Sequence, residues 1–148
     1  MNEPEVTVQL DRRPRSYEPG ELLSGSYRVD AGEQAVRRIE VSVLWRTAGK
    51  GDEDFGVHFF DHYAEEEGDE VHSRSSARFT TQLPNAPLSY QGVAVNIQWM
   101  VRVRVFLDDG KALVGERSFR LGHVPPAREV VRLPADAEIQ TGPPSRPT

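Results

Sequence analysis

The residues best able to do chemistry in this 148-residue chain are carboxylates gathered in one stretch. Residues 51–73 contain nine acids and no lysine or arginine: Asp52, Glu53, Asp54, Asp61, Glu65, Glu66, Glu67, Asp69 and Glu70. Several carboxylates can hold Ca²⁺, but the spacing of Asp52, Asp54 and Glu65–Glu67 matches no loop of defined ligand geometry. We therefore predict a solvated acidic loop that binds no metal and presents a surface to a basic partner.

Histidine and serine residues give no clearer catalytic pattern. His58, His62 and His72 lie near one another, but their spacing fits no structural zinc motif, and His58 and His72 fall on the outward side of their strands. Ser89 has no strand–turn–helix setting for a nucleophile. The Gly49–Gly51 stretch is too short for a phosphate loop. We expect neither an enzyme nor a cofactor.

Two arginines project together from the longest apolar segment. Arg102 and Arg104 are two residues apart, so they share the outward face of one strand. Arg74, Arg78 and Arg120 join them if their strands are neighbours, and such a face could dock an acidic peptide or a phosphate. We favour the other interpretation, a solvated face whose arginines pair with nearby acids. The candidate partner-binding residues are Arg102, Arg104, Arg78, Asp52, Asp54, Glu65, Glu66 and Glu67.

Composition narrows the class of protein. The chain has no cysteine, which excludes disulfides and thiolate metal sites and fits a reducing compartment. It shows no secretory signal and no apolar run of the ~18 residues that a membrane helix needs, so we expect a cytoplasmic protein. The net charge of −5 argues against a nucleic-acid binder. Sixteen arginines against two lysines favour a GC-rich, bacterial genome.

Strand patterns occupy most of the remaining sequence. Apolar and polar residues alternate with a period of two, which is typical of strands buried on one face. The alternating segments are residues 6–10, 23–29, 39–45, 55–59, 71–83, 93–107 and 113–121. Gly, Pro and Asp separate them, and no helical periodicity is present. The sequence therefore predicts an all-β, antiparallel, immunoglobulin-like sandwich of seven to eight strands.

The apolar positions also predict the core. Trp45 and Trp99 lie on the apolar side of their strands, so we expect both in one core. Five apolar residues break the alternation: Leu44, Phe60, Ala94, Met100 and Phe106. Arg117 falls on the apolar side of the last strand, which indicates a bulge near Gly115. Gly92 precedes the long strand and indicates a turn or a positive φ.

The composition changes after Gly122. The last 26 residues contain six prolines and cannot build a core. We divide the chain into a sandwich domain over residues 1–122 and a proline-rich tail over residues 123–148. Within the tail, Arg128–Leu133 has the pattern of a short strand that could pair with, and guard, a sheet edge.

Two segments resemble the arrestin family. Residues 17–21 (YEPGE), followed by Gly25 and Val29, are similar to the entry into the second strand of arrestin N-terminal domains. Leu83-Pro84, then residues 89–92 (SYQG), then Ile97, Trp99, Val101 and Val103 are similar to a hairpin and strand of the same family. The resemblance spans roughly residues 6–121, and implies a single arrestin-type sandwich that acts as a non-catalytic adaptor. A bacterial relative of the sporulation-control type would fit the arginine bias.

The sequence thus favours a protein-interaction adaptor or scaffold built on one arrestin-like sandwich. We expect a protein partner, no nucleic acid and no integral membrane segment, with self-association through edge strands as a further option. The alternative is a ligand-binding module for a sugar, a lipid or Ca²⁺, which would need a concave pocket or clustered oxygen ligands.

Overall fold

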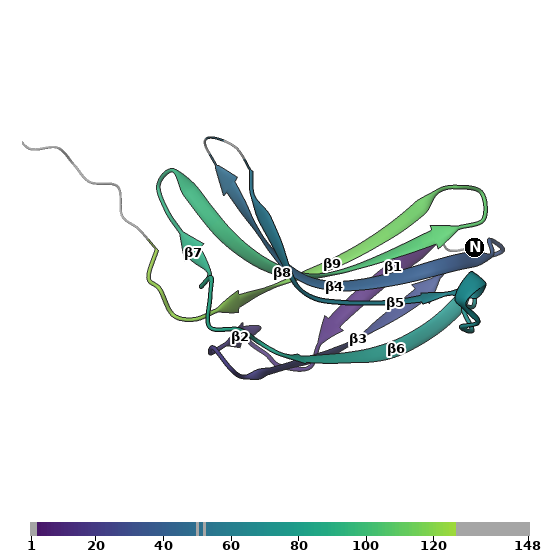
Figure 1. Cartoon of the computed structure of the whole chain (residues 1–148), viewed down its shortest axis with the longest axis horizontal. Coiled ribbons are helices and arrows are strands. Elements are labelled where there is room, and N and C mark those ends of the chain that lie inside the picture. Colours follow the sequence, from purple (N-terminus) through teal and green to yellow (C-terminus); the bar gives the residue numbers. More distant parts are fainter. Residues whose placement is uncertain (1–2, 50, 52, 127–148) are drawn as a thin grey trace, which may run out of the picture.

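The computed structural model describes residues 3–49, 51 and 53–126, which form two packed β-sheets (Figure 1). The strands are β1 (Glu5–Leu10), β2 (Ser16–Tyr17), β3 (Leu22–Asp30), β4 (Val36–Gly49), β5 (Phe55–Ala64), β6 (Arg74–Gln82), β7 (Tyr90–Gln91), β8 (Val95–Leu107) and β9 (Ala112–Leu121). One sheet has the order β1-β3-β6. The other has the order β2-β9-β8-β4-β5, with β7 paired to β8. The predicted sandwich is confirmed.

Alternation along the strands builds the core. Every second residue of β8 from Trp99 to Leu107 is buried against the three-stranded sheet, as the apolar pattern predicted. Trp99 is fully buried, and its indole Nε1 donates to the Pro87 carbonyl at 2.7 Å. Trp45 is only half-buried at the margin of this core, so its predicted full burial was wrong.

The two sheets differ in length, and this difference leaves apolar surface uncovered. The strands β4 and β8 have 14 and 13 residues, whereas β3 and β6 have nine each. The β4–β5 and β7–β8 hairpins consequently extend past the smaller sheet and curve away from it (Figure 1). Val93 and Val95 lie on this extension and are 66% and 38% exposed, although their place in the pattern predicted a covered face.

The last strand contains no bulge, contrary to the prediction. The register of β9 on β8 is continuous from Phe119 to Ala112. Gly115 is needed because β1 crosses directly over it, and a Cβ there would lie 2.6 Å from the Val6 carbonyl oxygen. Arg117 keeps its inward position because its Nε donates to the Val8 carbonyl at 3.0 Å. The inward arginine thus caps a backbone acceptor of β1.

The predicted turns are present, with one difference in backbone geometry. Gly20 closes the turn after Tyr17 with a φ of 84°. Gly92 lies between β7 and β8, and its N–H donates to the Val95 carbonyl at 2.9 Å. Its φ lies outside the left-handed region. Close packing requires glycine there, because a Cβ would lie 2.5 Å from the Val95 oxygen.

The acidic stretch is not one loop. Residues 55–64 form the ten-residue strand β5, and Glu65–Glu67 form a single 3-10 turn after it. The acids are therefore divided between the two ends of a strand. Asp52 lies outside the described residues, as does the predicted edge strand Arg128–Leu133 with most of the tail. No helix in the described part of the chain is long and apolar enough to cross a membrane.

Candidate functional site

Three of the apolar residues that break the strand alternation meet on one sheet face. Leu44 pairs directly with Met100 of β8 and with Val57 of β5. Ser42 pairs with Phe60, and Arg46 pairs with Phe55. Cross-strand partners share a face, so all these side chains lie on the face that points away from the three-stranded sheet, the outer face. We call Leu44, Phe55, Val57, Phe60 and Met100 the outer patch.

The outer patch combines buried and exposed apolar groups. Leu44 and Met100 are 5% and 3% exposed, so they form a small apolar floor outside the main core. Phe55, Val57 and Phe60 are 70%, 51% and 48% exposed along β5. Single exposed apolar residues are ordinary, but a row of three over an apolar floor is typical of an interaction surface.

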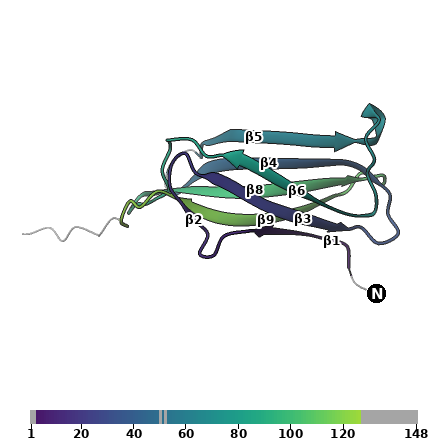
Figure 2. The same ribbon diagram turned by 90° about the horizontal axis from the view of Figure 1, so that it is seen from below.

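The exposed row follows an unpaired sheet edge. β5 is the last strand of its sheet and pairs only with β4 (Figure 2). Its register shifts opposite Val43 and Leu44, where His58 is the extra residue. This irregularity turns the His58 ring inward, 6.3 Å from the Trp99 ring and 2.7 Å from the Gln82 carbonyl oxygen of β6. The predicted outward orientation of His58 was wrong.

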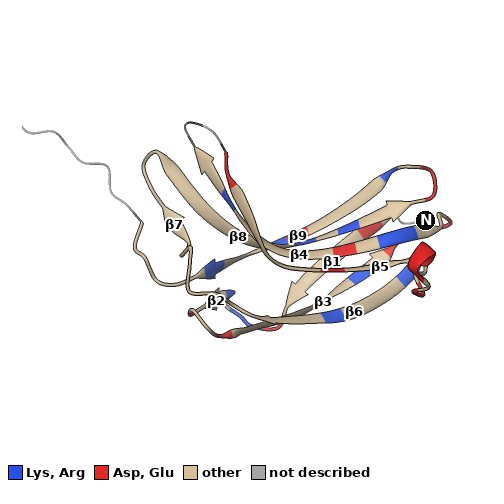
Figure 3. Cartoon of the chain, viewed as in Figure 1, with Lys and Arg blue, Asp and Glu red and all other residues tan. Residues whose placement is uncertain are grey.

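The acids flank this edge at separate places (Figure 3). Asp54 precedes β5 and Glu65–Glu67 follow it, roughly 35 Å apart along the strand. Asp61 lies within the strand, where its carboxylate accepts bonds from the His62 N–H at 2.9 Å and the Tyr63 hydroxyl at 3.3 Å. Among the described residues, no three His, Asp or Glu side chains are grouped so that they could hold a metal ion.

Among the acids of residues 53–70, only one has an arginine partner in the described structure. Glu67 lies 3.7 Å from Arg38 and 2.9 Å from His62. Within the described structure, no lysine or arginine nitrogen comes within 4.0 Å of Asp54, Asp61, Glu65 or Glu66. The edge of β5 is therefore apolar on its outer side and negatively charged around it.

The arginines considered as a basic face are divided between the two sheets and paired with acids. Arg102 and Arg104 do share the outer face of β8, but Arg102 bonds Glu116 at 2.6 Å and Arg104 lies 4.0 Å from Glu40. Arg78 is on β6 in the other sheet and pairs with Asp11. Arg74, also on β6, lies 3.7 Å from Asp30. The interpretation favoured from the sequence, arginines paired with neighbouring acids, describes this surface.

A shallow cavity of about 710 Å³ adjoins the outer patch. On one side of β8, β7 pairs as far as Ile97 and β9 pairs from Trp99 onward, so on that side Gln98 has no partner strand. The cavity lies at this gap. Arg46, Gln98 and Met100 line it from the sheet, and Tyr90 and Val124 line its rim. A second open cavity of about 770 Å³ lies at the opposite end, beside Arg37, Glu65, Glu66 and Lys111.

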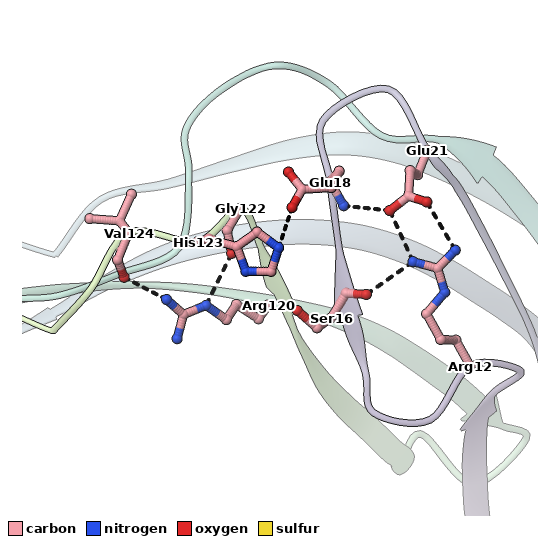
Figure 4. A network of polar contacts seen from close by, with 8 residues as sticks. All are labelled: Arg12, Ser16, Glu18, Glu21, Arg120, Gly122, His123 and Val124. Carbon is pink, nitrogen blue, oxygen red and sulfur yellow. Dashed lines mark hydrogen bonds and ion pairs between the residues drawn. The ribbon is translucent and has the colours of Figure 1, made fainter.

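A polar network fixes the chain where it leaves the sandwich beside the first cavity (Figure 4). The Arg120 guanidinium donates to the Gly122 carbonyl at 3.0 Å and to the Val124 carbonyl. His123 pairs with Glu18 in the turn that follows β2. These contacts attach residues 122–124 to β9 and to that turn. The Arg120 guanidinium is therefore bonded to nearby main-chain carbonyls and does not extend a basic face.

The same network contains the most perturbed carboxylate. Arg12 donates to both oxygens of Glu21, at 2.9 and 3.1 Å, and the Glu18 N–H donates to Glu21 at 2.6 Å. These bonds, first that from Arg12, lower the pKa of Glu21 to about 2. Glu21 follows the turn that carries the family motif. Glu21 therefore stabilises this turn through its bonds to Arg12 and Glu18.

Comparisons with known proteins identify the fold. No family model matches the chain, and no curated protein matches it. Among solved structures, the sporulation control protein Spo0M from Bacillus subtilis is similar, with a TM-score of 0.61 and 16% identity. The match covers 84% of this chain and 51% of Spo0M, so the chain spans about half the length of that protein. The fold is an arrestin-like β-sandwich, as the motifs predicted.

The sequence pattern alone did not reveal the outer patch. The signal was present in Leu44, Phe60 and Met100, which each broke the alternation. Their meaning depends on the register that places Leu44 opposite Met100, and on the irregularity that puts Val57 on the same face as Phe60.

Proposed function

We propose that this chain is a non-catalytic protein-interaction adaptor that binds a partner through the outer patch and the adjoining free edge of β5. The observation that carries the proposal is the row of exposed Phe55, Val57 and Phe60 beside unpaired backbone. Apolar contacts supply affinity to such a surface, and main-chain groups of an edge strand fix the register of what binds. The likeness to a protein named for sporulation control supports a regulatory role.

The setting proposed is the bacterial cytoplasm. The arginine-rich composition supports a bacterial source, and a chain without cysteine suits a reducing compartment.

The proposal is tested by capture with three baits from extracts of the source cells: the wild-type chain, Phe60→Asp and Val114→Asp. Phe60 and Val114 are matched, because both lie on the outer face and are 48% and 52% exposed, but Val114 is on β9. We expect partner proteins retained by the wild type and Val114→Asp, and lost with Phe60→Asp. Equal retention by all three baits would contradict the proposed surface. A saturable hydrolytic activity abolished by one Ser or His substitution would contradict the adaptor function itself.

A ligand-binding module is the second candidate, and the cavity beside the outer patch is the observation that favours it. The side-chain amides of Asn96 and Gln98 and the ring of Tyr90 line this cavity, and such groups suit a sugar. Trp99 also lines it, so its fluorescence reports occupancy. Saturable quenching by an oligosaccharide, lost in Gln98→Ala, would support this candidate over the adaptor.

A further inference from the structure

We infer that the free edge of β5 accepts an extended segment of the partner protein as an added strand, and that this segment alternates apolar residues with lysine or arginine. The inference rests on the proposed adaptor function and specifies the chemistry of the partner. It combines three features of β5: its unpaired backbone, the separate character of its two faces, and the acids around it.

The backbone provides the first feature. β5 has ten residues and one paired neighbour, β4. In an edge strand about half of the residues direct their N–H and C=O groups away from the sheet, where a further strand can bond them. On the inner side, the His58 ring bonds the Gln82 carbonyl and bridges to β6, so the space between the sheets is occupied there. The open approach is in the plane of the sheet.

The two faces of β5 dictate the alternation of the added strand. On the outer face, Phe55, Val57 and Phe60 would pack against apolar side chains of the partner. The inner row differs because it contains a charge between Phe59 and Tyr63: Asp61 pairs with the buried Val41, so it lies on the inner side, and it is exposed. An inward charge disfavours an edge-to-edge contact with an apolar strand. A partner cation at the facing position removes this penalty.

The surrounding acids favour a basic partner over a second copy of this chain. Residues 51–73 contain no lysine or arginine, and Asp54, Glu65 and Glu66 lie at the two ends of β5. Two such edges brought together would repel each other, whereas a basic segment would meet the Asp61 carboxylate within β5 and further carboxylates at either end. Charge complementarity therefore selects a basic strand, and it disfavours the self-association through β5 that edge strands in general allow.

The test uses the full chain labelled with ¹⁵N and three nine-residue peptides. The first alternates lysine and valine, the second replaces every lysine by glutamate, and the third is the lysine peptide with every main-chain nitrogen methylated, so that it cannot donate main-chain hydrogen bonds. We expect the lysine peptide to shift the β5 amide signals saturably and to slow their hydrogen exchange. Binding should be at least about tenfold weaker for the glutamate peptide, or about 1.4 kcal/mol, and lost for the N-methylated peptide.

Two variants locate the charge contact. Asp61→Asn should weaken binding of the lysine peptide by about two- to fivefold, the range of an exposed ion pair. Asp109→Asn, in the turn between β8 and β9, is the matched control and should leave binding unchanged. An equal effect of the two substitutions would overturn the assigned role of Asp61. Thermal melts of both variants establish that they are folded.

The remaining outcomes separate this inference from the adaptor function. Equal binding of the lysine and glutamate peptides would overturn the basic preference. An absence of β5 protection with every peptide would overturn strand addition, whereas the capture experiment with Phe60→Asp and Val114→Asp judges the adaptor function independently. Protection of β5 amides that rises with protein concentration, without peptide, would make a second copy the occupant and would also overturn the inference.

Discussion

The two margins of the six-stranded sheet are built in opposite ways. At one margin, β2 pairs in parallel with the end of β9, and backbone bonds join Arg120 to Arg15 at 2.9 Å and Gly122 to Tyr17 at 2.8 Å. Tyr17 is 2% exposed and packs edge-on against Phe119. At the other margin, β5 ends the sheet with the side chains of Phe55 and Phe60 exposed.

This difference indicates which margin stabilises the fold and which margin is available to bind a partner. An unpaired edge is a hazard that folded proteins normally cover or blunt. The two-residue strand β2 covers the end of β9 at Arg120 and Leu121. At the other margin, the inward Asp61 and the irregularity at His58 make edge-to-edge pairing less favourable, but no further strand covers β5 in the described structure. Residues at the first margin should therefore govern stability, and those at the second should govern binding.

The largest effect is expected from Tyr17→Ala at the covered margin. Removal of this buried ring should lower the free energy of unfolding by about 3–5 kcal/mol, as large core truncations do. Tyr17→Phe is the control: the Tyr17 hydroxyl is buried with no hydrogen-bond partner among the described residues, so its loss should be neutral or slightly stabilising. Denaturant unfolding measures both. A loss under about 1 kcal/mol for Tyr17→Ala would remove the contrast between the margins.

Alkaline pH should destabilise the protein next most strongly, through Tyr27 beside the β5 margin. Burial raises the pKa of Tyr27 to about 12, and negative charge on Tyr63 and Asp61 adds to the shift. Unfolded tyrosine ionises near pH 10, so the stabilisation is complete below pH 10 and is lost as the pH rises through 12. Its size is on the order of 2–3 kcal/mol.

Tyr27→Phe isolates this contribution. The variant keeps the buried ring but cannot ionise, so its stability should fall less steeply between pH 10 and 12. Burial also raises the pKa values of Tyr17 and Tyr63, so some slope should remain. Identical pH profiles for the variant and the wild type, measured by denaturant unfolding, would contradict the assignment to Tyr27.

A smaller, local effect is expected from Arg12→Gln in the network near β2. Without the Arg12 guanidinium, the pKa of Glu21 should rise from about 2 towards its ordinary value. The carboxyl carbon signal of Glu21 followed by NMR during acid titration measures this shift. Arg28→Gln, at an exposed position of β3, should leave the pKa of Glu21 unchanged. A similar rise in both variants would show that the Arg12 bonds are not its cause.

The smallest effect on stability is expected from Phe60→Ala at the open margin. The side chain is half exposed, so the free energy of unfolding should change by no more than about 0.5 kcal/mol. Partner capture should nevertheless fall, which is the reverse of Tyr17→Ala, where stability should fall and the binding surface is untouched. A large stability loss in Phe60→Ala with unchanged capture would show that Phe60 stabilises the fold and does not bind the partner. The open margin would then not be the binding surface.

The sequence by itself determined the class of fold. Apolar residues at every second position from Trp99 to Leu107 require an apolar layer on that side of the strand, and a period of two cannot be satisfied by a helix. The turn at Gly20 and the hairpin at Gly92 also followed from local chemistry, because glycine permits a positive φ or a close backbone approach. These features depend on residues near one another in the chain, so a single sequence reveals them.

Only the tertiary structure decided which surface is available to a partner. Pairing places Arg78 in a different sheet from Arg102, and it brings Glu116 to Arg102, so these arginines do not form one basic face. Strand β5 separates the acids that the sequence presents as one stretch. The register of β4 with β5 and β8 gathers the apolar exceptions into the outer patch. The physical reason is that sheet neighbours are set by hydrogen bonds between distant segments, and local periodicity contains no information about which strands pair.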